Sequence, residues 1–242
     1  MTAPAVLVCT TAFAGKIDME HHSSYLALEQ WALERGVRLG EYIYADSNID
    51  RARNACLGLF MKQTDFTHFL FVDADISFPP EAVERLLYLD RDIGGVAYRR
   101  RGGHGHVVEF DGEAVAGRRE IKTSEGFAVA KYIGTGFMMV KRDAFTKMIA
   151  AYPEREYIND DPTIPLKETW DLFSTFVLNR RLLSEDYGFC HLAKAIGLEI
   201  WVDLQTSLAH KTSDTLKGSF METAQKIAPK KVVDVKLIEP YI

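Results

Sequence analysis

The sequence predicts an α/β protein with a doubly wound, mixed but mostly parallel sheet flanked by helices. Short apolar runs alternate with segments of helical periodicity along the front of the chain. The 242 residues are 47% hydrophobic, which is enough for one sizeable core. No repeat or change of composition divides the chain. We therefore expect a single domain over 1–242, with a Rossmann-like nucleotide-binding half over about 1–99, a substrate half over about 100–217 and a tail over 218–242.

Four strands and three helices are expected in the front half. The apolar runs predict strands over 5–10, 38–45, 69–75 and 92–98, and the helical periodicity predicts helices over 23–36, 48–62 and 79–89. Gly36 ends the first helix, and a proline at an early position opens the third. Strands that alternate with helices at this spacing are typical of parallel sheets.

The alternation stops after about residue 99. The back half predicts a loop and hairpin over 99–117, a glycine turn followed by a strand and a helix over 134–152, a long loop over 152–173, a helix over 184–197 and a strand over 198–203. Ser184 is the expected N-cap of the last helix, and Gly197 is its expected stop.

Composition excludes several classes of protein. The net charge of −5 argues against a globally basic surface, so no nucleic-acid partner is expected. The three cysteines, Cys9, Cys56 and Cys190, are far apart and predict neither a disulfide framework nor a zinc pair, which fits a reducing compartment. The apolar run from Val6 to Cys9 reads as a first strand rather than a signal peptide, and no run is long enough to span a membrane. We predict a cytoplasmic protein, with an alternating tail that could pair with another subunit.

Two carboxylates follow the third predicted strand, in the stretch HFLFVDADISF. Ligands of open α/β sheets bind outside the carboxyl ends of the strands, where Asp73 and Asp75 are expected. Two residues apart on an extended chain, they would point to the same side. Their oxygens suit Mg²⁺ or Mn²⁺. The alternative is that these acids merely end a strand and cap the next helix.

This stretch resembles the DxD segment of nucleotide-sugar glycosyltransferases of the GT-A fold, in particular stand-alone domains similar to glycosyltransferase family 2. Further pieces resemble the same family and occur in its order: SNIDRARN, the glycine-loop segment GTGFMMVKRDAF, SEDYGFCHLAKAIGLEIWVD (similar to the xED helix), and SLAHK (similar to the C-terminal histidine segment). The resemblance covers roughly residues 5 to 217. It implies a metal-dependent transfer of a sugar from a nucleoside-diphosphate donor of UDP or GDP type to a hydroxyl of a carbohydrate or glycan acceptor.

The resemblance also implies roles for the metal ligands. Asp75 would bind the cation directly, Asp73 would contact the ribose or donor sugar and reach the metal through water, and His210 would be the third protein ligand. Imidazole is tolerated better by Mn²⁺ than by Mg²⁺, so Mn²⁺ is preferred. A lone histidine is more often a surface or core residue, which is the alternative for His210.

An acidic pair opens the helix that resembles the xED helix. By resemblance, Asp186 would be the general base of an inverting transfer, and Glu185 would at most contact the acceptor. Acidic residues in the first turn of a helix also improve capping, so the presence of two acids here can be explained without a catalytic role. A retaining enzyme with the same site stays open.

The remaining predicted contacts surround the donor and the acceptor. The residues expected at the nucleotide or donor are Thr10, Thr11, Arg53, Asn54, Asp73, Gly134, Thr135, Gly136 and Lys211, with Arg53 and Asn54 preferred over Arg51. Trp170 and Asp171 are candidates for an acceptor platform, although a core tryptophan is an equal alternative. The basic loop over 98–106 is either a lid over the diphosphate or an ordinary loop, and its histidines match no metal pattern.

Three other functions compete with this hypothesis. A phosphatase of the haloacid-dehalogenase type also carries DxD, but its downstream acidic motif is missing. A sugar nucleotidyltransferase would need a glycine-rich, basic loop after the first strand, which CTTAFAGKIDM does not supply. An inactive carbohydrate-binding relative would not need the acids and the histidine that are all present.

Overall fold

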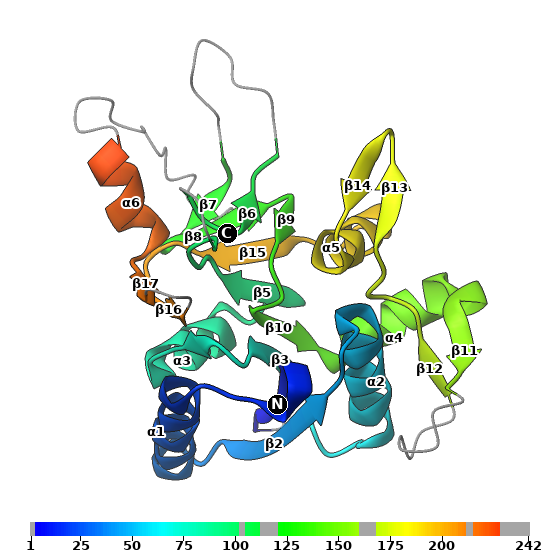
Figure 1. The fold of residues 1–242 in the computed structure, drawn as a ribbon, viewed down its shortest axis with the longest axis horizontal. Coiled ribbons are helices and arrows are strands. Elements are labelled where there is room, and N and C mark those ends of the chain that lie inside the picture. Colours follow the sequence, from blue (N-terminus) through cyan, green and yellow to red (C-terminus); the bar gives the residue numbers. More distant parts are fainter. Residues whose placement is uncertain (1–2, 102–104, 112–120, 160–167, 212–214, 228–242) are drawn as a thin grey trace.

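The computed structural model describes residues 3–101, 105–111, 121–159, 168–211 and 215–227. Its centre is an eight-stranded sheet with the order β2-β1-β3-β10-β5-β15-β8-β7 (Figure 1). These strands are β1 (Ala5–Ala12), β2 (Arg38–Ala45), β3 (His68–Asp73), β5 (Ile93–Val96), β7 (Thr123–Ser124), β8 (Phe127–Ala130), β10 (Phe137–Lys141) and β15 (Ile200–Asp203).

Helices cover both faces of this sheet (Figure 1). The helices are α1 (Met19–Arg35), α2 (Ile49–Lys62), α3 (Pro80–Leu89), α4 (Arg142–Ala151), α5 (Glu185–Ala195) and α6 (Phe220–Ile227), with short 3-10 turns η1 (Phe13–Gly15) and η2 (Pro153–Arg155). Helices α1 and α3 lie on one side, and α2, α4 and α5 lie on the other. Each side has its own core, one including Leu28 and Leu86 and the other including Phe60 and Phe145. Alternate residues of β1 enter the two cores, which explains why the strand is buried along its whole length and is mostly apolar.

The expected fold class is confirmed: the sheet is mixed, and its main strands run in one direction. β1 is parallel to β2 and β3, and β15 is parallel to β5. β10 is antiparallel to both β3 and β5, and β8 is antiparallel to β15. Because β10 returns between two parallel strands, the carboxyl ends of β1, β3 and β5 still meet at one edge of the sheet.

Short strands outside the main sheet shape the back half. They are β4 (Ile76–Ser77), β16 (Ala209–Lys211) and β17 (Thr215–Lys217) in one sheet, and the pairs β6 (Val108–Glu109) with β9 (Tyr132–Ile133), β11 (Glu156–Ile158) with β12 (Glu168–Trp170), and β13 (Phe176–Leu178) with β14 (Arg181–Leu183). The expected loop over 152–173 thus contains a strand pair, with 160–167 outside the described residues. The hairpin expected over 99–117 is a turn closed by the Arg99–His106 bridge, and 112–120 also lie outside the described residues.

Ser184 occupies the N-cap position of α5, but its side chain makes no capping hydrogen bond to the helix. It donates instead to the Asp186 carboxylate. Gly36 and Gly197 follow helices with positive φ angles of 67° and 85°, as their predicted role as stops requires. None of the helices in the described part of the chain has the length and hydrophobicity that a membrane crossing requires. The tail beyond residue 227 lies outside the described residues, so its pairing stays a prediction.

Candidate functional site

The two predicted acids lie at the carboxyl edge of the sheet, but they diverge. β3 ends at Asp73, opposite Thr11 of β1, and Ala74 and Asp75 form a turn. The expectation that both carboxylates point to one side assumed an extended chain and is wrong for that reason. Asp73 is directed to Arg53, whereas Asp75 is directed to His210.

Strand β16 brings the late histidine to Asp75. The Lys211 amide donates to the Asp75 carbonyl at 2.9 Å, which fixes the two segments side by side. His210 Nε2 lies 3.4 Å from Asp75 Oδ2, and Nδ1 is 2.7 Å from the Arg99 carbonyl. Because a carbonyl can only accept, Nδ1 carries the proton and Nε2 presents its lone pair. Burial lowers the pKa of His210, which favours this neutral form.

An arginine that was not predicted joins this pair. The Arg101 guanidinium forms an ion pair with Asp75, and its Nε is 3.0 Å from His210 Nε2. The sequence offered one signal for it, the basic run YRRRG, which predicts a charged loop without identifying the arginine that turns inward.

A buried chain of charges occupies the centre of the site. Arg53 of α2 has a side chain only 5% exposed, donates to Asp73 Oδ1 at 3.0 Å and pairs with Glu185 of α5. Burial opposes its charge, but Asp73 and Glu185 raise the pKa of Arg53 above its ordinary value. Burial raises the pKa of Glu185, and Arg53 opposes that shift. The chain thus connects the end of β3 with the start of α5.

Asp186 lies in the first turn of α5, beside this centre. Its Oδ1 accepts from the amide of Tyr187 at 2.8 Å and from Ser184. Its charge also raises the pKa of Arg53 and that of the buried phenol of Tyr98. Both the helix-start role and the role of a base remain compatible with this position.

Tyr98 is a second residue that sequence reasoning missed. Its hydroxyl accepts from the Gly136 amide at 3.1 Å, and its ring meets His210 edge to face at 5.4 Å. A Cβ atom at Gly134 or Gly136 would collide with this phenol. The glycines are therefore required for close packing on Tyr98. Between them, Thr135 is fully buried, and its Oγ1 has no hydrogen-bond partner among the described residues.

Several predicted contact residues are engaged with other parts of the chain. Thr10 Oγ1 is 3.1 Å from Nε2 of the buried His21, and the Lys211 ammonium donates to Glu20 at 2.7 Å. Asn54 exchanges two hydrogen bonds with the backbone of Phe173, at 2.9 and 3.0 Å. These contacts give each of the three a structural reason to be present, and their predicted nucleotide roles stay predictions.

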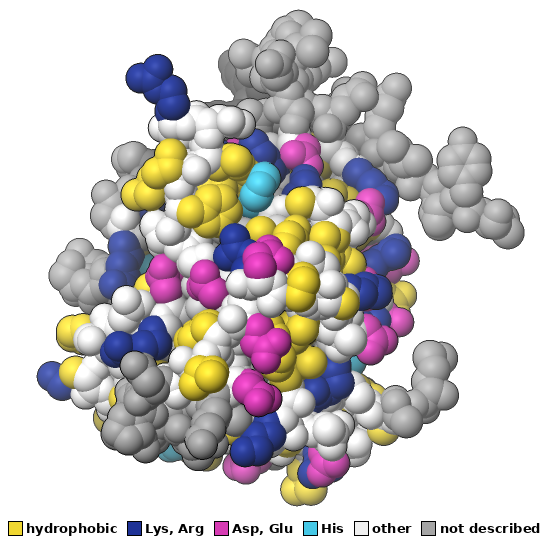
Figure 2. All heavy atoms as spheres, turned by 90° about the vertical axis from the view of Figure 1, so that its right-hand side faces the viewer, with side chains coloured by type: hydrophobic (Ala, Val, Ile, Leu, Met, Phe, Trp, Pro, Cys, Tyr) yellow, Lys and Arg dark blue, Asp and Glu magenta, His cyan; other side chains and the backbone are white. Residues whose placement is uncertain are grey.

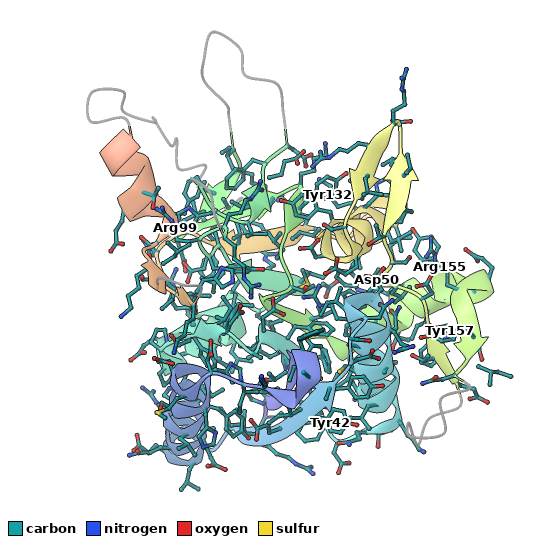
Figure 3. The ribbon with its side chains drawn as sticks, in the orientation of Figure 1. Tyr42, Asp50, Arg99, Tyr132, Arg155 and Tyr157 are labelled. Atoms are coloured by element: carbon teal, nitrogen blue, oxygen red, sulfur yellow. The ribbon has the colours of Figure 1, made fainter. Side chains whose placement is uncertain are left out.

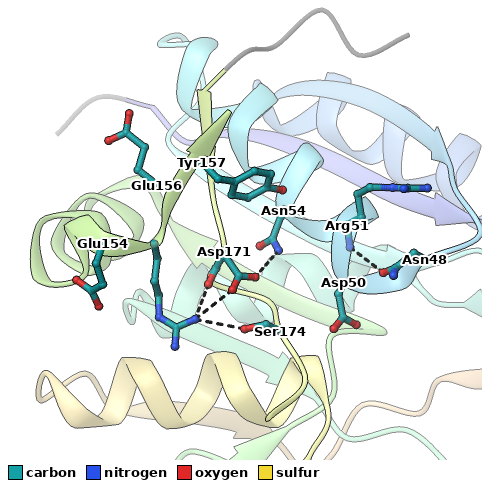
Figure 4. A pocket seen from close by; sticks show the side chains of 10 residues that line it. Asn48, Asp50, Arg51, Asn54, Glu154, Glu156, Tyr157, Asp171 and Ser174 are labelled. Atoms are coloured by element: carbon teal, nitrogen blue, oxygen red, sulfur yellow. Dashed lines mark hydrogen bonds and ion pairs between the residues drawn. The ribbon is translucent and has the colours of Figure 1, made fainter. Parts of the chain in front are cut away.

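A cavity of about 730 Å³ opens beside α2 (Figure 4). It is lined by Asn48, Asp50, Arg51, Asn54, Glu154, Arg155, Glu156, Tyr157, Asp171 and Ser174. Asp50, Arg155 and Tyr157 lie on the side of α2 and β11, whereas Arg99 lies on the other side of the view (Figure 3). Of the two residues predicted for an acceptor platform, Asp171 lines this cavity, whereas Trp170 packs against the core. The aromatic side chain in the cavity lining is that of Tyr157.

The cavity carries excess negative charge. Four carboxylates line it, and the lining Arg155 is bonded to Asp171 and Ser174. Arg51, the other lining cation, makes two hydrogen bonds to Asp46 at 2.6 and 2.7 Å. Figure 2 shows acidic side chains in magenta across the middle of this side of the molecule. Burial, Asp186 and, to the smallest extent, Asp50 of the cavity lining raise the pKa of Glu185, whereas Arg53 lowers it, so Asp50 lies within electrostatic range of the central charges.

The donor set for a divalent cation is partial. Within the described residues, no group of three His, Cys, Asp or Glu side chains has the arrangement of a metal site. Asp75 and His210 nevertheless fit as two ligands, because a neutral imidazole nitrogen and a carboxylate oxygen face each other at 3.4 Å. Asp75 Oδ2 is also buried without a well-formed hydrogen bond. The third predicted ligand, Asp73, turns to Arg53 instead.

Solved structures with a similar fold give the comparison with known proteins. The chain is similar to A197 from STIV, with 14% identity, a TM-score of 0.53 and coverage of 89% of this chain and 90% of that one. It also matches a mutant of the Drosophila β-1,4-galactosyltransferase 7 in complex with manganese, UDP-Gal and xylobiose, with 11% identity, a TM-score of 0.43 and coverage of 83% and 65%. A third match is the inositol-1-phosphate CTP transferase from T. maritima, with 11% identity, a TM-score of 0.42 and coverage of 95% and 98%.

These comparisons establish the fold and no more. Of the three structures just described, A197 from STIV is the one whose TM-score, 0.53, demonstrates a shared fold. No protein-family model matches the chain, and no curated protein matches it. The further matches include a glycosyltransferase involved in the glycosylation of the major capsid of PBCV-1, with 13% identity, a TM-score of 0.37 and coverage of 81% of this chain and 93% of that one.

Proposed function

We propose that this chain is a metal-dependent glycosyltransferase that moves a sugar from a nucleoside-diphosphate donor to a hydroxyl group of a carbohydrate acceptor. The observation that carries the proposal is that motif segments far apart in the sequence come together: Asp75 lies against His210, and Asp73 is joined through Arg53 to Glu185 at the acidic start of α5. A chain that used these acids only to end strands and helices would have no need to bring them together.

The donor side is assigned to Asp75, His210 and the central charge chain. A divalent cation held by Asp75 and His210 would supply the positive charge that stabilises the departing diphosphate. The ion pair with Arg53 holds Asp73 in place for a contact with ribose or donor sugar. The buried Tyr98 and the glycine loop close this side of the site against water.

The acceptor side is assigned to the cavity between α2 and η2. Its excess of carboxylates disfavours phosphate-like ligands and suits hydroxyl groups, which donate hydrogen bonds to acids. Tyr157 adds an aromatic face for a sugar ring. Asp50 of this cavity acts electrostatically on Glu185, so an acceptor here would lie on the side of the site where α5 begins.

Asp186 is proposed as the base of an inverting transfer. It takes the proton of the acceptor hydroxyl while the acceptor oxygen forms a bond to the anomeric carbon. The bond from that carbon to the diphosphate oxygen breaks, and the diphosphate leaves with the electron pair. A retaining transfer at the same site is the alternative. The anomeric configuration of the product, measured by NMR, separates the two.

Isothermal titration with UDP and GDP, with and without Mn²⁺, tests the proposal. We expect binding of one diphosphate that requires the metal, followed by diphosphate release from a matching nucleotide sugar in a donor screen. Metal-independent binding, or phosphate release from a monoester, would contradict the proposal. Pyrophosphate release from a nucleoside triphosphate and a sugar phosphate would instead identify a nucleotidyltransferase.

A further inference from the structure

Arg101 occupies the place where the proposed function requires a cation. Its guanidinium contacts Asp75, and its Nε lies 3.0 Å from His210 Nε2. Asp75 Oδ2 and His210 Nε2 are also the two atoms that would bind the divalent ion. The arginine therefore supplies the positive charge that neutralises Asp75 in this structure.

The backbone near Arg101 is held by two hydrogen bonds. Val107 donates to the Tyr98 carbonyl at 2.9 Å, and Arg100 donates to the Gly105 carbonyl at 3.1 Å. The Arg101 side chain is nevertheless 65% exposed, whereas those of Asp75 and His210 are 17% and 7% exposed. The acid and the histidine are thus fixed in the protein, and the guanidinium reaches them from the solvent side.

We propose that Arg101 and the divalent cation compete for Asp75 and His210. The inference rests on the metal of the proposed function. The Nε2 lone pair can accept from a guanidinium or bind a metal, but it cannot do both. Two cations at one carboxylate also repel each other. Metal binding therefore requires the Arg101 head group to leave, and its exposed side chain can swing into solvent while Asp75 and His210 stay in place.

His210 keeps its orientation during this exchange. Its Nδ1 is bonded to the Arg99 carbonyl, so the lone pair of Nε2 remains directed at the same position after Arg101 departs. The site is consequently preformed for the metal, and the arginine reduces the affinity for the metal without being needed to build the site.

Titration with Mn²⁺ alone, followed by the electron paramagnetic resonance signal of the free ion, tests this competition. We expect Arg101→Gln to bind Mn²⁺ roughly tenfold more tightly than the unmodified chain, because the competing charge is gone. Arg101→Lys keeps a positive charge and should show a smaller gain. Arg100→Gln is the matched control and should leave the affinity unchanged, because it removes the same charge from the neighbouring, exposed residue.

An Arg101→Gln variant that binds Mn²⁺ no more tightly than the unmodified chain would overturn the competition. An equal gain in Arg100→Gln would overturn it as well, because the effect would then be one of general charge. Absence of Mn²⁺ binding in every variant, with circular dichroism showing an intact fold, would contradict the metal of the proposed function itself. Titration of each variant with UDP in the same buffers tests nucleotide binding separately. A failure of the competition can therefore be distinguished from a failure of the proposed function.

Discussion

At the scale of single residues, Asp75 is the side chain whose chemistry is most specific. Its carboxylate is largely buried, and its neighbours are a neutral imidazole and an exposed cation, Arg101. An acid that is buried next to a histidine lone pair carries a desolvation cost that an apolar residue would avoid. A role in binding a cation explains the residue better than a role in stability does.

We therefore expect Asp75→Ala to abolish sugar transfer and metal-dependent binding of the diphosphate. The free energy of unfolding, measured in urea, should change by less than about 1 kcal/mol. Asp65→Ala is a suitable control because Asp65 is exposed and forms a surface ion pair with Arg38. Transfer at the unmodified rate in Asp75→Ala would end the metal assignment.

Asp186→Asn separates binding from proton transfer. Asparagine retains an oxygen that can accept from the Tyr187 amide, so the start of α5 should be preserved. Donor binding measured by calorimetry should therefore be unchanged, while the transfer rate falls by about two orders of magnitude or more. A normal transfer rate would indicate a retaining mechanism or another base.

At the scale of elements, local patterns were sufficient where the chain alternates regularly. The strand expected over 38–45 is β2 with the same bounds, and the Gly36 and Gly197 stops are correct. The β13–β14 hairpin was missed because its turn residues, Asn179 and Arg180, adopt positive φ angles without a glycine to signal them. The antiparallel insertion of β10 was not predicted, since its apolar pattern is the same in either direction.

The glycine loop before β10 gives a prediction at the element scale. A Cβ atom at Gly136 would lie 2.5 Å from the Tyr98 hydroxyl oxygen and 2.6 Å from the ring carbon that bears it. Gly136→Ala should therefore displace Tyr98 and lower the free energy of unfolding by about 1 to 3 kcal/mol. Because Tyr98 contacts the His210 ring, Mn²⁺ affinity should fall in the same variant.

Gly94→Ala is the matched control for that change. Gly94 lies in the neighbouring β5, and a Cβ atom there would meet only the ends of the Leu86 and Leu89 side chains, at 3.2 and 3.3 Å. These ends can shift by small rotations, so a smaller loss of stability is expected. Equal losses in urea unfolding for the two variants would show that the phenol is not the cause.

At the scale of the whole molecule, the sequence predicted which segments form the site but not the contacts between them. The acids, the histidine and the start of α5 were all named, because each belongs to a recognisable motif. Arg101 and Tyr98 were not, because their partners Asp75 and Gly136 are distant in the sequence and only the folded sheet brings them together. The divergence of Asp73 and Asp75 also depended on where β3 ends, which no local pattern fixes.

Buried histidines predict how the whole fold responds to acid. Burial and, to a smaller extent, the nearby Lys141 lower the pKa of His68, at the start of β3, to about 4. The unfolded chain binds a proton at this residue near pH 6.5, whereas the folded chain stays neutral. The contribution of His68 to stability is thus present above that pH and is lost as the pH falls toward 4. Burial also lowers the pKa of His21, His106 and His210, so the same direction holds for each.

The His68 contribution is isolated by comparing His68→Asn with the unmodified chain in urea at about pH 7 and pH 5. The unmodified chain should lose about 1 to 2 kcal/mol more than the variant over this interval, because asparagine does not titrate. His22→Asn controls for the substitution at an exposed histidine and should show the same loss as the unmodified chain. If His68→Asn were as sensitive to acid as the unmodified chain, the acid sensitivity would have to come from the histidines around the site, whose variants would also alter Mn²⁺ binding.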